Sequence, residues 1–302
     1  MPIGNIKIWI RAARLRTLPL SMSGIIVGNA LCLNEDDFSW GLFLLMLATA
    51  ISFQIVSNLA NDYGDGVKGT DNSTRIGPER VLQSGLLTKD LLKKGIIGSS
   101  LLAFILAFIL ITSAFGTSSW LYFAVFILLT VFSVWAAIAY TVGQNAYGYF
   151  GFGDLFVFIF FGLVSVIGAY FLQMKEISYL AVAFALILGL LSVAVLNLNN
   201  MRDLESDQVA GKRTIAVILG PQISKYYHYT IIVSAAVILV VFSMQLKITY
   251  YWLSLLGIIP LVFHLIIVLF NKEPKALDPE LKKVALTTFA LAILLFISFS
   301  LG

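Results

Sequence analysis

Residues 41–71 read GLFLLMLATAISFQIVSNLANDYGDGVKGTD. About twenty residues at the start of this stretch are almost all apolar, which is the length that a helix needs to cross the hydrocarbon core of a bilayer. Carboxylate and amide side chains follow without a polar spacer. Because a carboxylate next to hydrocarbon is costly unless it has a partner, the stretch predicts a membrane helix that carries a binding site at its end.

The rest of the chain has the same apolar character. It is 302 residues long, with 59% hydrophobic and 12% charged residues and a mean hydropathy of +0.93. Soluble domains are about one quarter charged, so this composition is typical of a membrane protein with many spans. The formal net charge of +4 does not indicate nucleic-acid binding, because the cations follow the membrane topology described below.

Nine stretches are long and apolar enough to cross the membrane. Since backbone groups in lipid must hydrogen-bond internally, we expect helices rather than strands. The two long acidic loops follow the second and sixth spans, which suggests an internal duplication. We therefore predict one all-α integral membrane domain over residues 1–302, with nine transmembrane helices around a central cavity, arranged as two four-helix bundles plus one helix, and cytoplasmic cap loops after helices 2 and 6. The predicted spans are residues 18–33, 41–61, 95–115, 119–141, 151–172, 178–199, 229–246, 250–270 and 284–301.

The positive charges indicate the orientation of these spans. All Lys and Arg residues except Lys175 and Lys247 lie in segments on one side of the predicted topology. Cytoplasmic segments of membrane proteins are enriched in Lys and Arg, so this side is cytoplasmic, and it carries the N-terminus and both acidic clusters. We expect a multi-pass protein of the cell (plasma or inner) membrane, surrounded by lipid, whose site opens to the cytoplasm.

The first acidic cluster continues a polar stripe on the span 41–61. Gln54, Asn58, Asp62 and Asp65 recur at spacings of three and four, so they share one helical face. A solvated loop with an ordinary helix cap is the alternative, but the extension of the stripe back to Gln54 favours a cavity. Magnesium prefers oxygen ligands, often one or two carboxylates. The predicted metal ligands are Asp62, Asp65 and Asp71, and the predicted diphosphate-binding residues are Asn58, Asn61, Lys68 and Arg75.

The second acidic cluster ends the span 178–199. Asp203 and Asp207 lie one helical turn apart, and they repel each other unless they share a cation. The GKRT sequence at residues 211–214 lacks the preceding glycines of a nucleotide-binding loop, so we reject nucleotide binding. The predicted metal ligands are Asp203 and Asp207, and the predicted diphosphate-binding residues are Asn199, Asn200 and Lys212.

Two acidic clusters on one membrane face, each followed by cations, indicate a divalent metal and a diphosphate that are presented to an apolar substrate. This combination favours an enzyme. A cation-coupled transporter is the alternative, with the aspartates as its ion site. Transporters usually hold their ions near the middle of the bilayer on broken helices, whereas both clusters lie at helix ends.

These motifs resemble the UbiA superfamily of intramembrane aromatic prenyltransferases, and within it the branch that uses 1,4-dihydroxy-2-naphthoate in menaquinone synthesis. The resemblance covers nearly the whole chain. The superfamily's first motif commonly has a further Asp at the position of Gly69, where Asp71 is the nearest substitute, and the loop 143–146 lacks the expected prolines. The motifs that carry the resemblance are residues 14–19, 61–65, 69–71, 147–149, 151–154, 202–207 and 211–214.

The resemblance implies a reaction and a set of site residues. Magnesium ions held by Asp62, Asp65, Asp203 and Asp207 would bridge the diphosphate of a polyprenyl donor, and Lys68, Lys212 and either Arg14 or Arg75 would stabilise the departing diphosphate. Asp65, Asp203, Lys68 and Lys212 would be the catalytic residues. The dihydroxynaphthoate ring would then be prenylated with loss of carbon dioxide to give demethylmenaquinone. A related enzyme that uses 4-hydroxybenzoate or another acceptor is the alternative, and the chain length of the donor and the oligomeric state stay open.

Two further polar residues, Asp154 and Tyr140, are not predicted to belong to the site. Asp154 begins the span 151–172, where we expect it to cap that helix rather than to contact the ring substrate. Tyr140, at the cytoplasmic end of the span 119–141, either faces the cavity or anchors the helix at the headgroup level.

Overall fold

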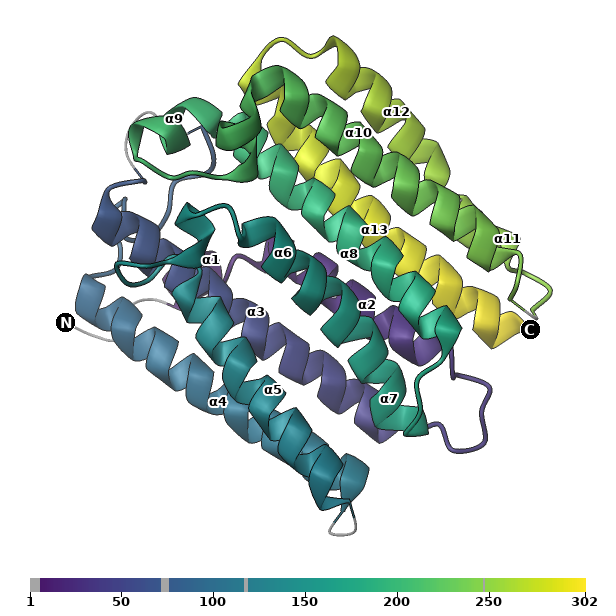
Figure 1. The fold of residues 1–302 in the computed structure, drawn as a ribbon. Helices are drawn as coiled ribbons and strands as arrows, with labels where there is room; N and C mark the ends of the chain where they lie inside the picture. The colour runs from purple at the N-terminus through teal and green to yellow at the C-terminus, as the bar shows by residue number, and fades with distance from the viewer. Residues whose placement is uncertain (1–5, 72–75, 117–118, 247) are drawn as a thin grey trace.

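The structure is a computed structural model that describes residues 6–71, 76–116, 119–246 and 248–302. Those residues form helices and connecting loops, with no β-strand (Figure 1). Eight helices are long and apolar enough to span a membrane, so the chain is a multi-pass membrane protein, as predicted. They are α3 (Trp40–Lys68), α4 (Lys89–Phe115), α5 (Trp120–Ala139), the continuous helix α6–α7 (Gly153–Met174), α8 (Tyr179–Arg202), α10 (Ile215–Ser243), α11–α12 (Trp252–Phe270) and the last helix (Pro274–Leu301), whose α-helical part is α13 (Leu277–Leu301).

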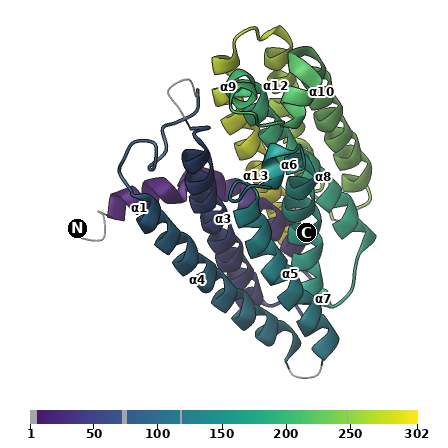
Figure 2. The ribbon, with the colours of Figure 1, turned by 60° about the vertical axis from the view of Figure 1, so that its left-hand side comes forward.

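The first predicted span is shorter than expected. Instead of residues 18–33, the helix α2 covers Leu18–Ala30, and its 13 residues extend only about 20 Å. A separate helix, α1 (Ile6–Ala13), precedes it and lies across the ends of α3 and α4 (Figure 2). The elbow between α1 and α2 is made by Arg14, whose φ of 50° and ψ of 58° are left-handed and cannot continue a helix.

The helices pack as two groups joined by the last one. α3 contacts α2, α4 and α5, whereas α8 contacts α6–α7 and α10. α13 packs on both α2 and α8, so it joins the groups rather than standing beside them (Figure 1). α5, in contrast, lies at the periphery of the assembly. Apolar side chains along its outer face, such as Leu128 and Trp135, are exposed and suited to lipid contact.

Both polar helix ends meet at one end of this assembly. α3 ends at Lys68, and the next residue, Gly69, has a φ of 75° that terminates the helix. α8 ends at Arg202, and Asp203 links it to the short α9 (Leu204–Val209). The segment 76–88 folds back over the end of α3, and η2 (Tyr147–Tyr149) leads into α6. The ends of α3 and α8, although more than a hundred residues apart, can therefore form one site.

Candidate active site

The first acidic cluster is closed by an arginine that the motifs did not single out. Asp65, only 3% exposed, lies 2.9 Å from Nη1 of Arg80, and Asp71 lies 3.2 Å from Nε of the same guanidinium. Burial alone would lower the pKa of Arg80, but these carboxylates raise it. Arg80 therefore stays charged and draws the turn after α3 over the end of that helix.

Asp62 also has a clear structural role. Its two carboxylate oxygens accept hydrogen bonds from the backbone N–H groups of Val81 and Leu82, at 3.1 and 3.2 Å. These bonds tie the returning segment to α3 and place Arg80 next to Asp65. If Asp62 is also a metal ligand, as predicted, it has two roles: it binds the metal and it holds the segment 76–88 on α3.

The second acidic cluster has its own cations. The guanidinium of Arg202 donates to both oxygens of Asp203, at 2.9 and 2.6 Å, and also pairs with Asp278 of α13. Asp207 of α9 lies 3.6 Å from the ammonium group of Lys212, which is 6% exposed. Asp203 and Asp207 therefore each have a cation close by, as buried carboxylates require.

Tyr149 of η2 joins the two clusters. Its hydroxyl donates to Oδ1 of Asp65 at 2.8 Å and lies 2.6 Å from the hydroxyl of Thr70. The ammonium groups of Lys68 and Lys212 lie over its ring, 3.8 and 5.6 Å from the centroid, within the range of cation–π attraction. Tyr149 therefore contacts a residue from the end of α3 and a residue from the loop after α9, although the sequence motif assigned it no role.

The charges of the two clusters interact directly. Lys212 is attracted by Asp65 of the first cluster and by Asp207 of the second, and these carboxylates raise its pKa against the effect of burial. Burial raises the pKa of Asp207 to about 6, because the attraction of Lys212 does not fully offset it, and the negative charges of Asp203 and Asp65 act in the same direction as burial. The carboxylates from α3 and α9 are thus in one electrostatic field, which a further cation would stabilise.

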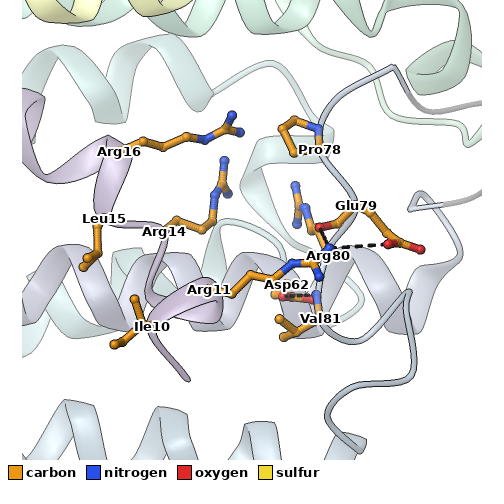
Figure 3. Close-up of a pocket in the computed structure, with 10 residues that line it drawn as sticks. All are labelled: Ile10, Arg11, Arg14, Leu15, Arg16, Asp62, Pro78, Glu79, Arg80 and Val81. Carbon is orange, nitrogen blue, oxygen red and sulfur yellow. Dashed lines mark hydrogen bonds and ion pairs between the residues drawn. The ribbon is translucent and has the colours of Figure 1, made fainter. Parts of the chain in front are cut away.

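A cationic cavity of about 340 Å³ opens on the α1 side of the first cluster (Figure 3). Arg14, Arg16 and Arg80 turn their guanidinium groups toward the same space (Figure 3). Burial lowers the pKa of Arg16, the charges of Arg202 and Arg80 add to this shift, and Asp278 opposes it. Arg16 therefore lies between the cations of both clusters, in a position that suits a bound anion. The lining residues are Ile10, Arg11, Arg14, Leu15, Arg16, Asp62, Pro78, Glu79, Arg80 and Val81.

Several predicted diphosphate-binding residues have other contacts. The amide of Asn58 donates to the carbonyl oxygen of Ala13 and to the hydroxyl of Thr17, at 2.8 and 2.9 Å, and accepts a bond from Gln54. This amide anchors the elbow between α1 and α2 on α3. The other positions are as follows: Asn61 accepts a bond from Thr141, Asn199 accepts one from Arg202, Asn200 is buried, Lys68 is exposed, and Arg75 lies outside the described residues.

The donor atoms present suit magnesium. Within the described ranges, no three His, Cys, Asp or Glu side chains are grouped closely enough to form a metal site by themselves. Oδ2 of Asp207 and Oδ1 of Asn200 are nevertheless buried with no hydrogen-bond partner among the residues described. Magnesium commonly takes one or two carboxylates and completes its shell with water and phosphate oxygens, so Asp65 and Asp207 fit such an ion if the substrate supplies further ligands.

Comparisons with known proteins give the relatives and the fold of the chain. Residues 21–282 match the UbiA prenyltransferase family. A 1,4-dihydroxy-2-naphthoate octaprenyltransferase of Escherichia coli (strain K12) is 39% identical, with 93% of this chain and 91% of that protein covered. One of Haemophilus influenzae is also 39% identical, with 99% and 96% covered. The solved structure of a UbiA homolog from Archaeoglobus fulgidus bound to DMAPP and Mg2+ has a TM-score of 0.68 at 14% identity, covers 97% of this chain and 99% of its own, and supports the fold.

Proposed function

The chain belongs to the UbiA prenyltransferase family, and we propose that it transfers a polyprenyl group from polyprenyl diphosphate to 1,4-dihydroxy-2-naphthoate, with loss of carbon dioxide and release of diphosphate, to give demethylmenaquinol, the reduced form of demethylmenaquinone. Support comes from the two 1,4-dihydroxy-2-naphthoate octaprenyltransferases, which are 39% identical to the chain over more than nine tenths of its length. The same relatives disfavour 4-hydroxybenzoate as the acceptor. The charge pattern supports an orientation in the inner membrane with the site on the cytoplasmic side.

One observation carries the proposal from the structure. Lys212 and Tyr149 bring the carboxylate ends of α3 and α9 into one site, with Asp65 and Asp207 both acting on the same ammonium group. Such an arrangement can bind a diphosphate and a divalent cation together. An ion-coupled transporter would not need the additional guanidinium groups of Arg14, Arg16 and Arg80 beside its carboxylates.

Each part of the site has a distinct role in this reaction. Asp65 and Asp207 would hold magnesium, with Asp62, Asp71 and Asp203 as further ligands; when bound, the metal supplies positive charge that neutralises the diphosphate. The cations Lys68, Lys212, Arg14 and Arg16 bind the diphosphate oxygens and stabilise the charge that develops as the donor's C–O bond breaks. The amides Asn61, Asn199 and Asn200 are proposed to contact the diphosphate at the edge of this site.

The apolar body of the protein protects the reacting carbon. The long helices place hydrocarbon side chains directly below the polar ends, so water is excluded from the electrophilic prenyl group once the diphosphate leaves. The ring then forms a bond to the donor carbon, and the carboxyl group leaves as carbon dioxide. The prenyl chain is itself a hydrocarbon, which explains why a membrane is the natural site for this reaction.

A direct test uses the purified protein in detergent or lipid discs. With octaprenyl diphosphate, dihydroxynaphthoate and magnesium, we expect a product with the mass of demethylmenaquinol, which oxidation in air converts to demethylmenaquinone, and no product after chelation with EDTA. Replacing the acceptor by 4-hydroxybenzoate should give no product. Cation flux in vesicles without any prenyl transfer would contradict the proposal and favour the transporter.

A further inference from the structure

Asp154 is a carboxylate inside the bundle without a counter-ion. It is 8% exposed, and no Lys, Arg or His forms an ion pair with it in the described part of the chain. It does not cap α6, as the sequence suggested: the residue before that helix is Phe152, and no side chain caps it. Asp154 instead lies in the first turn of α6, where the helix dipole favours a negative charge. A buried carboxylate without a counter-ion is nevertheless costly, so the position calls for a further explanation.

A tyrosine from another helix holds this carboxylate. The hydroxyl of Tyr227, on α10, donates to Oδ2 of Asp154 at 2.9 Å. Because α6 and α10 are separate spans, this bond fixes where the carboxylate lies relative to both. The carboxylate still has capacity to accept a hydrogen bond from a ligand, since an ionised carboxylate has about four acceptor positions.

Tyr140 places Asp154 next to the candidate active site. Its ring packs against two glycines: a Cβ atom at Gly148 would lie 2.8 Å from the ring, and one at Gly153 would lie 3.3 Å from the hydroxyl. The same tyrosine is within electrostatic range of Lys212, Asp65 and Asp154. Asp154, which follows Gly153 at the start of α6, therefore lies close to Tyr140, and Tyr140 is in turn close to the charges of both clusters.

The aromatic acceptor has groups that match this arrangement. Its carboxylate is repelled by Asp154 and attracted by the cations around Lys212 and Arg16, whereas its ring hydroxyl can donate a hydrogen bond to Asp154. That bond would increase the electron density of the ring, which is the nucleophile. We propose that Asp154, positioned by Tyr227, accepts a hydrogen bond from a ring hydroxyl of the acceptor and so orients the ring toward the donor carbon.

This inference rests on the proposed function and adds the recognition of the acceptor. No net proton transfer is required: a C–C bond forms to the prenyl group, the donor's C–O bond breaks, and the bond to the carboxyl group breaks to release carbon dioxide. Asp154 contacts the substrate in this scheme, whereas Tyr227 acts through Asp154 and is a positioning residue.

The test compares kinetic constants of Asp154→Asn and Tyr227→Phe with the wild type. When a mutation removes a hydrogen bond between a ligand and a charged side chain, the affinity for that ligand falls about ten- to hundredfold. We expect Asp154→Asn to raise KM for dihydroxynaphthoate by that factor and to leave KM for the prenyl diphosphate unchanged. Tyr227→Phe should have a smaller effect in the same direction, and Tyr226→Phe, at a neighbouring tyrosine that is 58% exposed, should have none.

Acceptor analogues that lack one ring hydroxyl provide the second measurement. The wild type with the analogue that lacks the recognised hydroxyl should have the same raised KM as Asp154→Asn with the full acceptor. Combining the mutation with the analogue should raise KM no further. Additive losses, or an unchanged KM for the acceptor in Asp154→Asn, would overturn the inference. If Asp154→Asn does not fold, Tyr227→Phe with the analogues decides in the same way. The proposed function is tested by the activity of the wild type alone. The inference about Asp154 is tested by the variants, measured with whichever hydroxylated acceptor the wild type uses.

Discussion

At the residue scale, a few buried charges do the work of joining the two clusters. Asp65 is bound by Arg80 and Tyr149, and its charge also attracts Lys212, so one carboxylate contacts the returning segment after α3 and acts electrostatically on the loop after α9. Buried charges of this kind are stable only as a connected set, because removing one partner leaves the others without compensation.

Lys212 and its neighbour offer a matched pair for testing this set. Lys212→Met removes a buried cation that faces Asp65 and Asp207, so we expect kcat to fall about a hundredfold, the loss typical of one electrostatic stabiliser. Arg213→Met changes an exposed side chain one residue away and should keep most of the activity. Equal losses in the two variants, measured by product formation under saturating substrates, would contradict the assignment.

Asp65 is expected to determine the metal requirement. Asp65→Asn retains an acceptor for the hydrogen bond from Tyr149 and leaves Asp71 as a counter-ion of Arg80, so we expect a lower Tm but a folded protein, whose turnover falls at least a hundredfold because the negative charge is lost. A titration of residual activity with magnesium should show a higher half-saturating concentration than in the wild type. Asp36→Asn, in an exposed loop, is the control. Wild-type magnesium dependence in Asp65→Asn would remove this residue from the metal site.

At the element scale, the elbow between α1 and α2 positions the cationic cavity. The left-handed backbone of Arg14 interrupts the helix between α1 and α2, and Asn58 of α3 fixes this elbow through its hydrogen bonds to Ala13 and Thr17. The side chains of Arg14 and Arg16 leave from this elbow into the cavity (Figure 3). A polar residue on one helix thus decides where the cations of another segment lie.

Asn58→Ala separates this anchoring from a direct contact with the diphosphate. Loss of two or three buried hydrogen bonds should lower the free energy of unfolding by about 2–3 kcal/mol, at about 1 kcal/mol each. We expect a lower Tm together with a higher KM for the donor, because the arginines are displaced. Thermal stability in lipid discs and donor kinetics measure the two effects, with the exposed Asn145→Ala as control. An unchanged Tm with a raised KM would instead support direct diphosphate contact.

At the scale of the whole molecule, a buried polar chain ties three C-terminal helices together. His228 of α10 lies 2.8 Å from His264 of α12, and His264 lies 2.7 Å from Glu280 of α13, which also binds Lys283. Association of helices in lipid lacks a hydrophobic driving force, so such hydrogen bonds help to specify which helices pair. None of these four residues is assigned to the reaction, although Tyr227 and Asp278, on the same helices, contact Asp154 and Arg202.

Glu280→Ala should therefore affect stability and not catalysis. It leaves a ring nitrogen of His264 buried without a partner, which costs about 1–3 kcal/mol. We expect a lower Tm in lipid discs with both KM values unchanged. Glu35→Ala, in an exposed loop, should change neither quantity. A changed KM for either substrate in Glu280→Ala would show that this chain communicates with the site.

The sequence by itself determined the helical membrane fold, the position of most spans and the two acidic helix ends. These follow from hydrophobicity and from the need of each backbone group for a partner, which are local properties. At the first span the helix ends at Ala30 instead of residue 33, and α2 packs on α3 and α13, contacts that hydrophobicity along the chain does not reveal.

Only the tertiary structure decided which residues meet. Tyr149 between the two clusters, Arg80 on Asp65, Asn58 beneath the elbow and Tyr227 on Asp154 all join segments far apart in the chain. Such pairings depend on how the helices rotate and slide against one another as they pack. Spacing along one helix shows which side chains share a face, but not what that face will contact.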